Sequence, residues 1–215
     1  MFNRFSNVHT FLSKQGHILE IESEDFPKYV NEEPVAYTDD ELKKLFSVCD
    51  PQERLLYRFA WMTGFRLGEL QHAEWKDIDT ANSTVTVRSK PQYNWEPKAK
   101  KGRTVPIPDV LLTELLEAKK SATSTLIFPG ANGKVEGHML RRLKATAKRA
   151  GLNPGDAWLH KFRSSYITGH INNGIPLPTV SRWAGHENLS TTQRYAASIS
   201  GNTVRDKLNS TFANI

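Results

Sequence analysis

The stretch that decides the fold is TGFRLGELQHAEWKDID, residues 63–79, because the hydrophobic pattern of the chain changes across it. Ahead of it, apolar residues recur at helical spacing and stop at Gly64, a residue suited to end a helix. Within it, residues 66–75 predict a further short helix. Beyond it, residues 84–88 (TVTVR) and 103–107 (RTVPI) alternate as β-strands do. The sequence therefore predicts helices that lead into a small sheet.

Two capping boxes predict the helices that precede this stretch. Thr38 is followed three residues later by Glu41, and Asp50 by Glu53, so each pair can close hydrogen bonds on a helix N-terminus. We expect the first helix to end near residue 48 and the second to end at the glycine just described.

The connection between the two strands, residues 89–102, is too long for a tight turn. We expect the strands to pair antiparallel, and the connection to be a protruding basic loop or to include a short third strand. Helical patterns then return over 109–120, 137–150, 160–172, 177–184, 190–196 and a polar tail from about residue 201. The expected fold class is α+β, mainly α, with a small antiparallel sheet of about three strands.

The amino-terminal part of the chain differs in charge from the rest. Nine acidic residues and one lysine lie between Glu20 and Glu41, which leaves a net charge of +14 on the remainder of a chain whose total is +6. Prolines in this part disfavour regular structure. We therefore expect a short helix and an acidic linker over residues 1–37, and a second domain over residues 38–215.

The composition limits the class of protein. A basic remainder suits a polyanion, because each phosphate that a Lys or Arg neutralises releases a condensed counterion, although a solvated basic surface explains it as well. No apolar run approaches the roughly 18 residues of a membrane span, and the amino terminus lacks a signal pattern. The single cysteine, Cys49, excludes an internal disulfide and agrees with a reducing compartment. We expect a cytoplasmic protein without a membrane partner.

Three clusters of polar side chains have both a chemical and a structural interpretation. His160 and Arg163 share one face of a helix, where they could converge on an anion or form a solvated surface. Glu69 could hold the guanidinium of Arg66, three residues before it, in a structural pair. Cations on the loop before the second strand could deliver a proton or attract phosphate: Lys98, Lys100, Lys101 and Arg103.

A fourth cluster is WAGHENLSTTQRYA, residues 183–196, in which His186 and Tyr195 stand nine residues apart. By itself, a tyrosine beside alanines is typical of core packing. The chain has no GxxxxGK[ST] loop that would cradle a nucleotide, and no acidic cluster suited to Mg²⁺. The clusters therefore have to be interpreted together, in their order along the chain.

That order strongly resembles the tyrosine recombinases, the phage integrase family of DNA strand-exchange enzymes. The segments that carry the resemblance are EEPVAYTDDELKKLF, TGFRLGELQHAEWKDID, KAKKGRTVPIP, LHKFRSSYIT and WAGHENLSTTQRYA, which together cover about residues 34–200. Five ordered motifs with such spacings do not arise readily by chance. The resemblance implies a helical catalytic domain with a small sheet.

The resemblance implies that Tyr195 attacks a DNA phosphodiester, giving a 3′-phosphotyrosyl enzyme and a free 5′-hydroxyl. It implies that Arg66 and Arg163 stabilise the charge on the phosphate oxygens. His160 and His186 would donate hydrogen bonds to the same oxygens or help to move the tyrosine proton. Because the covalent intermediate conserves the bond energy, neither ATP nor a metal ion is needed, and we expect no cofactor.

The family takes the proton for the leaving 5′ oxygen from a hairpin lysine. Lys98 is the match, and Lys100 and Lys101 are alternatives because loop lengths vary. Glu69 would support Arg66. We expect DNA contacts from the rest of this loop and from the basic helix over residues 137–150, namely Lys100, Lys101, Arg103, Arg141, Arg142, Lys144, Lys148 and Arg149.

The chain departs from the family pattern in two ways. Lys161 stands where the family often has an acidic residue. Family members also commonly carry a helical core-binding domain before the catalytic domain, of which only a last helix and linker would fit in residues 1–33.

The resemblance also implies the partners and the setting. We expect double-stranded DNA as partner, a homo-tetramer on recombining DNA that can be a monomer in isolation, and a nucleoid-associated location of prokaryotic or phage type. Two rival functions share the features above: a type IB topoisomerase-like strand relaxer and a catalytically idle DNA-binding module.

Overall fold

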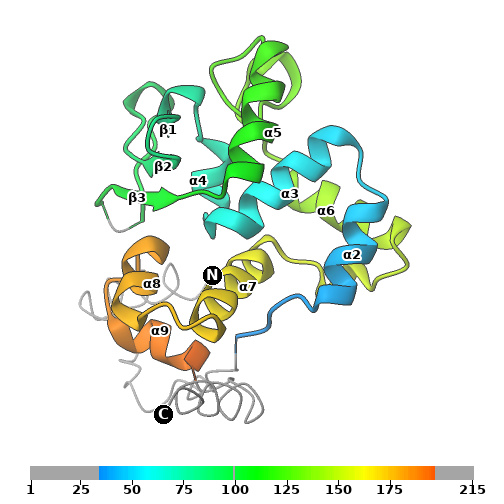
Figure 1. Ribbon diagram of the computed structural model, residues 1–215. Helices are drawn as coiled ribbons and strands as arrows, with labels where there is room; N and C mark the ends of the chain where they lie inside the picture. Colours follow the sequence, from blue (N-terminus) through cyan, green and yellow to red (C-terminus); the bar gives the residue numbers. More distant parts are fainter. Residues whose placement is uncertain (1–33, 99, 197–215) are drawn as a thin grey trace, which may run out of the picture. The chain divides into compact units, whose positions relative to one another are not determined.

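The computed structural model describes residues 34–98 and 100–196, and Figure 1 shows the course of the chain. The helices are α2 (Asp39–Ser47), α3 (Pro51–Thr63), α4 (Leu67–Gln71), α5 (Asp109–Lys120), α6 (Met139–Arg149), α7 (Leu159–Asn172), α8 (Leu177–Ala184) and α9 (Leu189–Ala196). The strands are β1 (Ile78–Asp79), β2 (Thr84–Val87) and β3 (Arg103–Pro106). The segment expected over residues 1–33 and the tail helix from about residue 201 lie outside the described residues.

The sheet confirms the expected fold class. Its strand order is β1-β2-β3, and both pairings are antiparallel. The central Val85 pairs with Ile78 on one side and with Val105 on the other. Because Val85 and Val105 are fully buried, the inner face of the sheet closes over the helical core. No helix in the described parts of the chain is long and apolar enough to cross a membrane.

The third strand does not lie in the connection between β2 and β3. It is β1, which precedes β2 in the chain. The connection is a loop, which folds back on itself through a 3₁₀ turn at Pro91–Tyr93 and a backbone bridge between Lys90 and Trp95. The short β1 was missed because two residues are too few to show an alternating pattern.

The helix expected over residues 66–75 is shorter than predicted, because α4 ends at Gln71. The backbone beyond it pairs with a distant segment. Ile127 donates its N–H to Ala73 O at 2.9 Å, and Trp75 donates to Thr125 O at 3.1 Å. These long-range bonds replace the helical ones, and no local signal in the sequence reports them.

The remaining helices agree with the predictions within a few residues. In the first capping box, Glu41 donates its N–H to Thr38 Oγ1 at 3.2 Å and its carboxylate accepts from Thr38 N at 2.8 Å. Asp50 and Glu53 form the second box in the same way. Helix α3 ends at Gly64, which has a left-handed φ of +63°.

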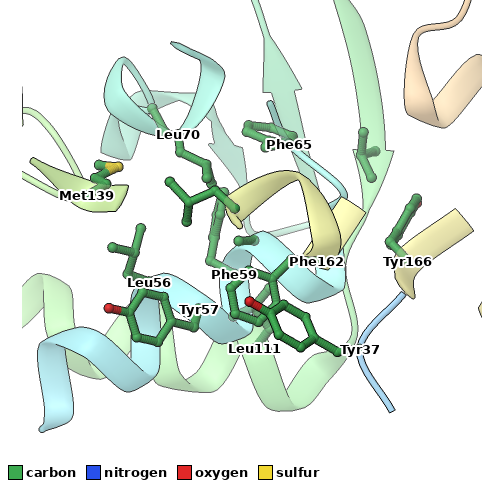
Figure 2. Packing of buried hydrophobic residues seen from close by; sticks show 14 of the residues in the cluster. Tyr37, Leu56, Tyr57, Phe59, Phe65, Leu70, Leu111, Met139, Phe162 and Tyr166 are labelled. Carbon is green, nitrogen blue, oxygen red and sulfur yellow. The ribbon is translucent and has the colours of Figure 1, made fainter. Parts of the chain in front are cut away.

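Helices α3 and α7 pack against each other at the centre of the core (Figure 2). The rings of Tyr57 on α3 and Phe162 on α7 stack with centroids 5.7 Å apart, and Phe162 also lies 4.7 Å from Tyr37. Tyr57 and Phe162 are fully buried. Since α7 is held along most of its length, the residue after Phe162, Arg163, has a fixed place inside the molecule.

A buried ion cluster fixes the start of the loop between β2 and β3. Lys90 Nζ donates to Glu74 Oε2 at 2.6 Å and to Asp77 Oδ2 at 2.6 Å. All three side chains are less than 5% exposed. Lys76 and Arg88 pair with the same two carboxylates from the exposed side, at 3.0 Å each. Removal of Lys90 takes away the buried cation of the cluster, and two buried carboxylates without it cost more than the loss of the attraction itself.

Replacement of this lysine by a residue of similar length is therefore expected to destabilise the fold strongly. We predict that Lys90→Met lowers the free energy of unfolding by about 3–5 kcal/mol. Urea denaturation of both proteins measures the difference. Lys119→Met on the exposed end of α5 is the matched control and should change stability by less than about 0.5 kcal/mol. Equal small effects of both substitutions would show that the buried cluster is not a stability determinant.

Candidate active site

Two arginines that are far apart in the sequence meet at the ends of two helices. Arg163 is 1% exposed, and its Nη1 and Nη2 donate to Gly64 O at 2.8 Å and to Ala184 O at 2.6 Å. Arg66, just before α4, donates from Nη2 to Gly185 O at 2.8 Å. The carbonyls of two consecutive residues therefore hold the two guanidinium groups side by side.

These acceptors are well suited to cations. Gly64 follows α3, whereas Ala184 and Gly185 end α8, and the carbonyls at a helix C-terminus carry partial negative charge. Both glycines have left-handed φ angles, +63° and +67°. A Cβ on Gly64 would lie 2.5 Å from Tyr166 Cδ1, so the close approach requires glycine. Burial, and then the charges of Arg66 and Arg103, lower the pKa of Arg163 to about 9, which leaves it protonated near neutral pH.

Glu69 joins Arg66 to a third arginine. Its Oε1 accepts from Arg66 Nη1 at 3.2 Å, and its two oxygens accept from Arg103 at 2.7 and 2.6 Å. Burial by itself raises the pKa of Glu69, but the hydrogen bonds and charge of Arg103, followed by those of Arg66, outweigh this effect and lower it. Glu69 is therefore a carboxylate, and it offsets part of the positive charge.

Arg103 was predicted to contact DNA, and the structure gives it a different place. Its side chain is 7% exposed, and its Nε donates to Trp183 O at 2.6 Å. Its guanidinium forms a bidentate salt bridge with Glu69. In the sequence, Arg103 looks like one more member of a run of exposed cations. It differs from the lysines before it because it is the first residue of a strand, β3.

His186 and Tyr195 lie together beside the arginines. His186 Nδ1 is 2.8 Å from Thr192 Oγ1, and its ring stacks on that of Tyr195 with centroids 6.2 Å apart and 20° between the planes. Tyr195, on α9, is 5% exposed. Burial, and then Arg163, Arg66, His160 and Arg103, lower the pKa of His186 to about 3. Thr192 was not predicted, although its spacing from His186 is visible in the sequence.

His160 occupies the first turn of α7, one turn before Arg163, and it is exposed. Its ring surface is accessible, but the protein atoms around it displace part of its water; this partial burial, and then the charges of Arg163 and Arg66, lower its pKa. Both histidines are therefore neutral near neutral pH, and each can donate a hydrogen bond from one ring nitrogen.

The loop lysines border the same region. Lys98 is exposed and lines a cleft of about 250 Å³ together with Arg66, His186 and Thr191. Lys101 lines a neighbouring cleft of about 420 Å³ that also includes Arg66 and His186. Lys100 is exposed and has a left-handed φ of +51°. The structure thus places both Lys98 and Lys101 within clefts that reach the arginines.

The basic residues of α6 have different surroundings. Arg141 and Lys148 are exposed, and Lys144 Nζ lies 4.5 Å from the ring centroid of Trp158, two residues before His160. The other two form ion pairs that the sequence did not predict: Arg142 with Glu136, and Arg149 with Glu53. Lys144 therefore lies close to the segment that leads into His160, and Arg141 and Lys148 lie one turn of α6 to either side of Lys144.

Lys161, the departure from the family pattern, is 7% exposed and faces α2. Its Nζ donates to Glu41 Oε1 at 2.8 Å and lies 4.4 Å from the ring centroid of Tyr37. It joins α7 to α2. Within the described residues, no group of three or more His, Cys, Asp and Glu is placed to hold a metal ion.

The fold and the site together define a class of protein. The model of the phage integrase family matches residues 36–200, which contain all six residues to which the sequence assigned catalytic roles. The chain belongs to the phage integrase family.

Known relatives agree with this assignment. The chain is 30% identical over 176 residues to tyrosine recombinase XerA of Thermococcus kodakarensis. The aligned region covers 79% of this chain and 60% of that relative. The chain therefore spans less than two thirds of the length of this relative.

Solved structures share the fold. The Tn1549 transposon integrase in complex with a circular intermediate DNA matches with a TM-score of 0.71 and 20% identity, over 93% of this chain and 74% of that one. The catalytic domain of bacteriophage HP1 integrase matches with a TM-score of 0.58 and 22% identity, over 85% of this chain and 98% of that one.

The low pKa of His186 predicts a loss of stability in acid. In the unfolded chain the histidine takes up a proton below its ordinary value of 6.5, whereas in the folded chain it does so only near 3. The unfolded state thus binds more protons between these values, and stability falls as the pH falls below about 6.5.

We predict that His186→Gln, which cannot titrate, loses less stability than the unchanged protein between about pH 7 and pH 5. Urea denaturation at the two pH values measures this loss. His138→Gln, at an exposed position before α6, is the matched control and should lose as much as the unchanged protein. Indistinguishable losses in all three proteins would show that His186 titrates normally.

Proposed function

We propose that the chain is the catalytic domain of a site-specific DNA recombinase or integrase that cuts and rejoins strands through Tyr195. The observation that carries the proposal is the arginine pair: Ala184 O and Gly185 O hold Arg163 and Arg66 beside His186. Two planar cations at one place match the two non-bridging oxygens of a phosphodiester. The tyrosine next to His186 supplies the nucleophile.

The cleavage step can be written from these residues. The Tyr195 oxygen gives up its proton to solvent water and forms a bond to phosphorus, while the bond from phosphorus to the 5′ oxygen breaks. The 5′ oxygen takes a proton from Lys98, so that a free 5′-hydroxyl and a 3′-phosphotyrosyl bond result. Arg66 and Arg163 stabilise the charge that grows on the other two oxygens. Attack by another 5′-hydroxyl reverses the step, without ATP or a metal ion.

The neutral histidines can donate to the same oxygens. His160, in the first turn of α7, and His186 each present an uncharged ring that can donate one hydrogen bond. Tyr195 is buried in this structure, so engagement of DNA has to be accompanied by a small movement of α9.

The proposed partner is double-stranded DNA. The Tn1549 integrase, which shares the fold, was crystallised with DNA. In this chain, the exposed cations of α6 and the loop lysines flank the site. By resemblance to the family, we further infer a homo-tetramer on recombining DNA and a nucleoid-associated location in the cytoplasm.

The direct test is a covalent adduct. On a nicked duplex from which the cleaved strand loses a short fragment, the protein is expected to form a denaturation-resistant complex with DNA. Tyr195→Phe should abolish this complex and keep DNA binding, because it removes only the attacking oxygen. Tyr93→Phe, which removes a hydroxyl that pairs with Thr125, is the matched control and should retain the adduct.

The outcomes separate the rival functions. Binding without any adduct would identify an idle DNA-binding module. An adduct accompanied by relaxation of supercoiled DNA, without strand exchange, would identify a topoisomerase-like relaxer. An adduct at a residue other than Tyr195, found by mapping the modified peptide, would contradict the assignment.

Charge reversal on α6 tests the DNA surface. We predict that the double variant Arg141→Glu, Lys148→Glu weakens DNA binding and lowers the salt dependence of log Kd by about 1 for each phosphate that the variant no longer neutralises. The double variant Lys119→Glu, Lys120→Glu on α5 changes the net charge equally and serves as control. Titration of labelled duplex at several salt concentrations measures both. Equal weakening by the two pairs would show that only net charge matters.

A further inference from the structure

The loop that carries Lys98 is attached at both ends to the helix that begins next to Arg66. We propose that Trp95, whose ring stacks on that of His72 at the end of α4, is a positioning residue that holds Lys98 in place beside the active site. The proposal rests on the proposed function, because it concerns proton delivery in that reaction. It is carried by contacts on the two sides of residues 96–102.

The first half of the loop is a rigid turn. Lys90 N donates to Trp95 O at 2.9 Å, and Trp95 N donates to Lys90 O at 3.2 Å, which closes residues 90–95 into a small ring. The Lys90 side chain is fixed in the buried cluster with Glu74 and Asp77. The turn therefore has a firm base, and Trp95 lies in this base, directly opposite Lys90.

Trp95 connects this turn to α4 and the residue that follows it. Its ring stacks on that of His72 with centroids 4.7 Å apart and 9° between the planes. His72 Nδ1 lies 2.7 Å from Gly68 O, and since the carbonyl can only accept, the ring N–H donates. A Cβ on Gly68 would lie 2.9 Å from Trp95 Nε1, so the indole packs directly on the backbone of α4.

The other end of the loop is attached to the same helix by a different contact. Arg103, the first residue of β3, is held by both oxygens of Glu69 on α4. Gly102 packs closely, since a Cβ there would lie 2.8 Å from Val87 O. Trp95 and Arg103 thus place the two ends of the lysine loop on one short helix.

This arrangement ties the proton donor to the phosphate ligand. Arg66 directly precedes α4, so a helix of five residues relates its guanidinium to both ends of the loop. Lys98 is only three residues beyond Trp95, and it lines one cleft with Arg66 and His186. Without the indole, the turn stays closed on Lys90 but loses its attachment to α4, so the start of the lysine loop is free to shift relative to Arg66. A misplacement of about 1 Å can cost 10²-fold in rate.

The experiment compares two leaving groups under single-turnover conditions with excess protein. One nicked duplex has the natural 5′ oxygen at the cleavage site, and the other has sulfur in its place. A thiol has a pKa of about 8.5, far below that of an alcohol, so the sulfur departs without a proton donor. The sulfur substrate therefore removes the need for Lys98 and leaves every other requirement unchanged.

Lys98→Ala is expected to slow cleavage of the oxygen substrate by about 10²–10⁴-fold and to cleave the sulfur substrate nearly as the unchanged protein does. Trp95→Ala should show the same pattern, with a loss of about 10²-fold on oxygen and a few-fold at most on sulfur. Trp95→Phe, which keeps a ring over His72, should recover most of the rate. His72→Ala should lose rate on oxygen as Trp95→Ala does, and it provides a second test if Trp95→Ala does not fold.

The matched control is Trp61→Ala. This half-buried tryptophan on α3 packs on Phe46, and its removal should lower the melting temperature without changing the ratio of the two rates. Equal slowing of both substrates by Trp95→Ala and His72→Ala would overturn the positioning role. Failure of sulfur to rescue Lys98→Ala would overturn it as well. No adduct with the unchanged protein on either substrate would instead refute the proposed function.

Discussion

The structure of the site depends on one arrangement, two guanidinium groups held side by side by the carbonyls of Ala184 and Gly185. Like charges at close range repel, and burial strengthens the repulsion because little water screens it. The fold offsets this with the ends of α3 and α8, whose last carbonyls point at the arginines, and with the single carboxylate of Glu69. Burial first, and then the positive field that remains, lower the pKa values of Arg163 and His186.

The same arrangement explains why distant elements must fold together. Arg163 comes from α7, its acceptors come from the ends of α3 and α8, and Arg66 is joined through Glu69 to β3. The packing of α7 on α3 through Phe162 and Tyr57 therefore fixes the first arginine as well as the core. The site has no independent framework, because the contacts that build it are also contacts between the main elements of the domain.

The sequence predicted those parts of the structure that depend on local signals. Capping boxes placed the starts of α2 and α3, and glycine placed the end of α3. The resemblance of the ordered motifs to the tyrosine recombinases, and no local signal, brought Arg66, Arg163, His186 and Tyr195 into one set. What it could not predict depends on distant contacts. The early end of α4 follows from backbone bonds to residues 125–127, and the place of Arg103 follows from a pair with Glu69 that lies 34 positions earlier. Composition alone does not distinguish a buried arginine from an exposed lysine beside it.

The charge balance of the site also indicates which state of the proposed reaction it favours. Arg66, Arg103 and Arg163 together with Glu69 carry a net charge of +2, and the two histidines are neutral. A DNA phosphodiester carries one negative charge, whereas the five-coordinate phosphorus formed by attack of a phenolate carries two. A preformed positive charge interacts more strongly with the second state than with the first, and only such a difference lowers the barrier. Because the lowered pKa values leave both histidines neutral, this preference for the second state rests on the three arginines and Glu69.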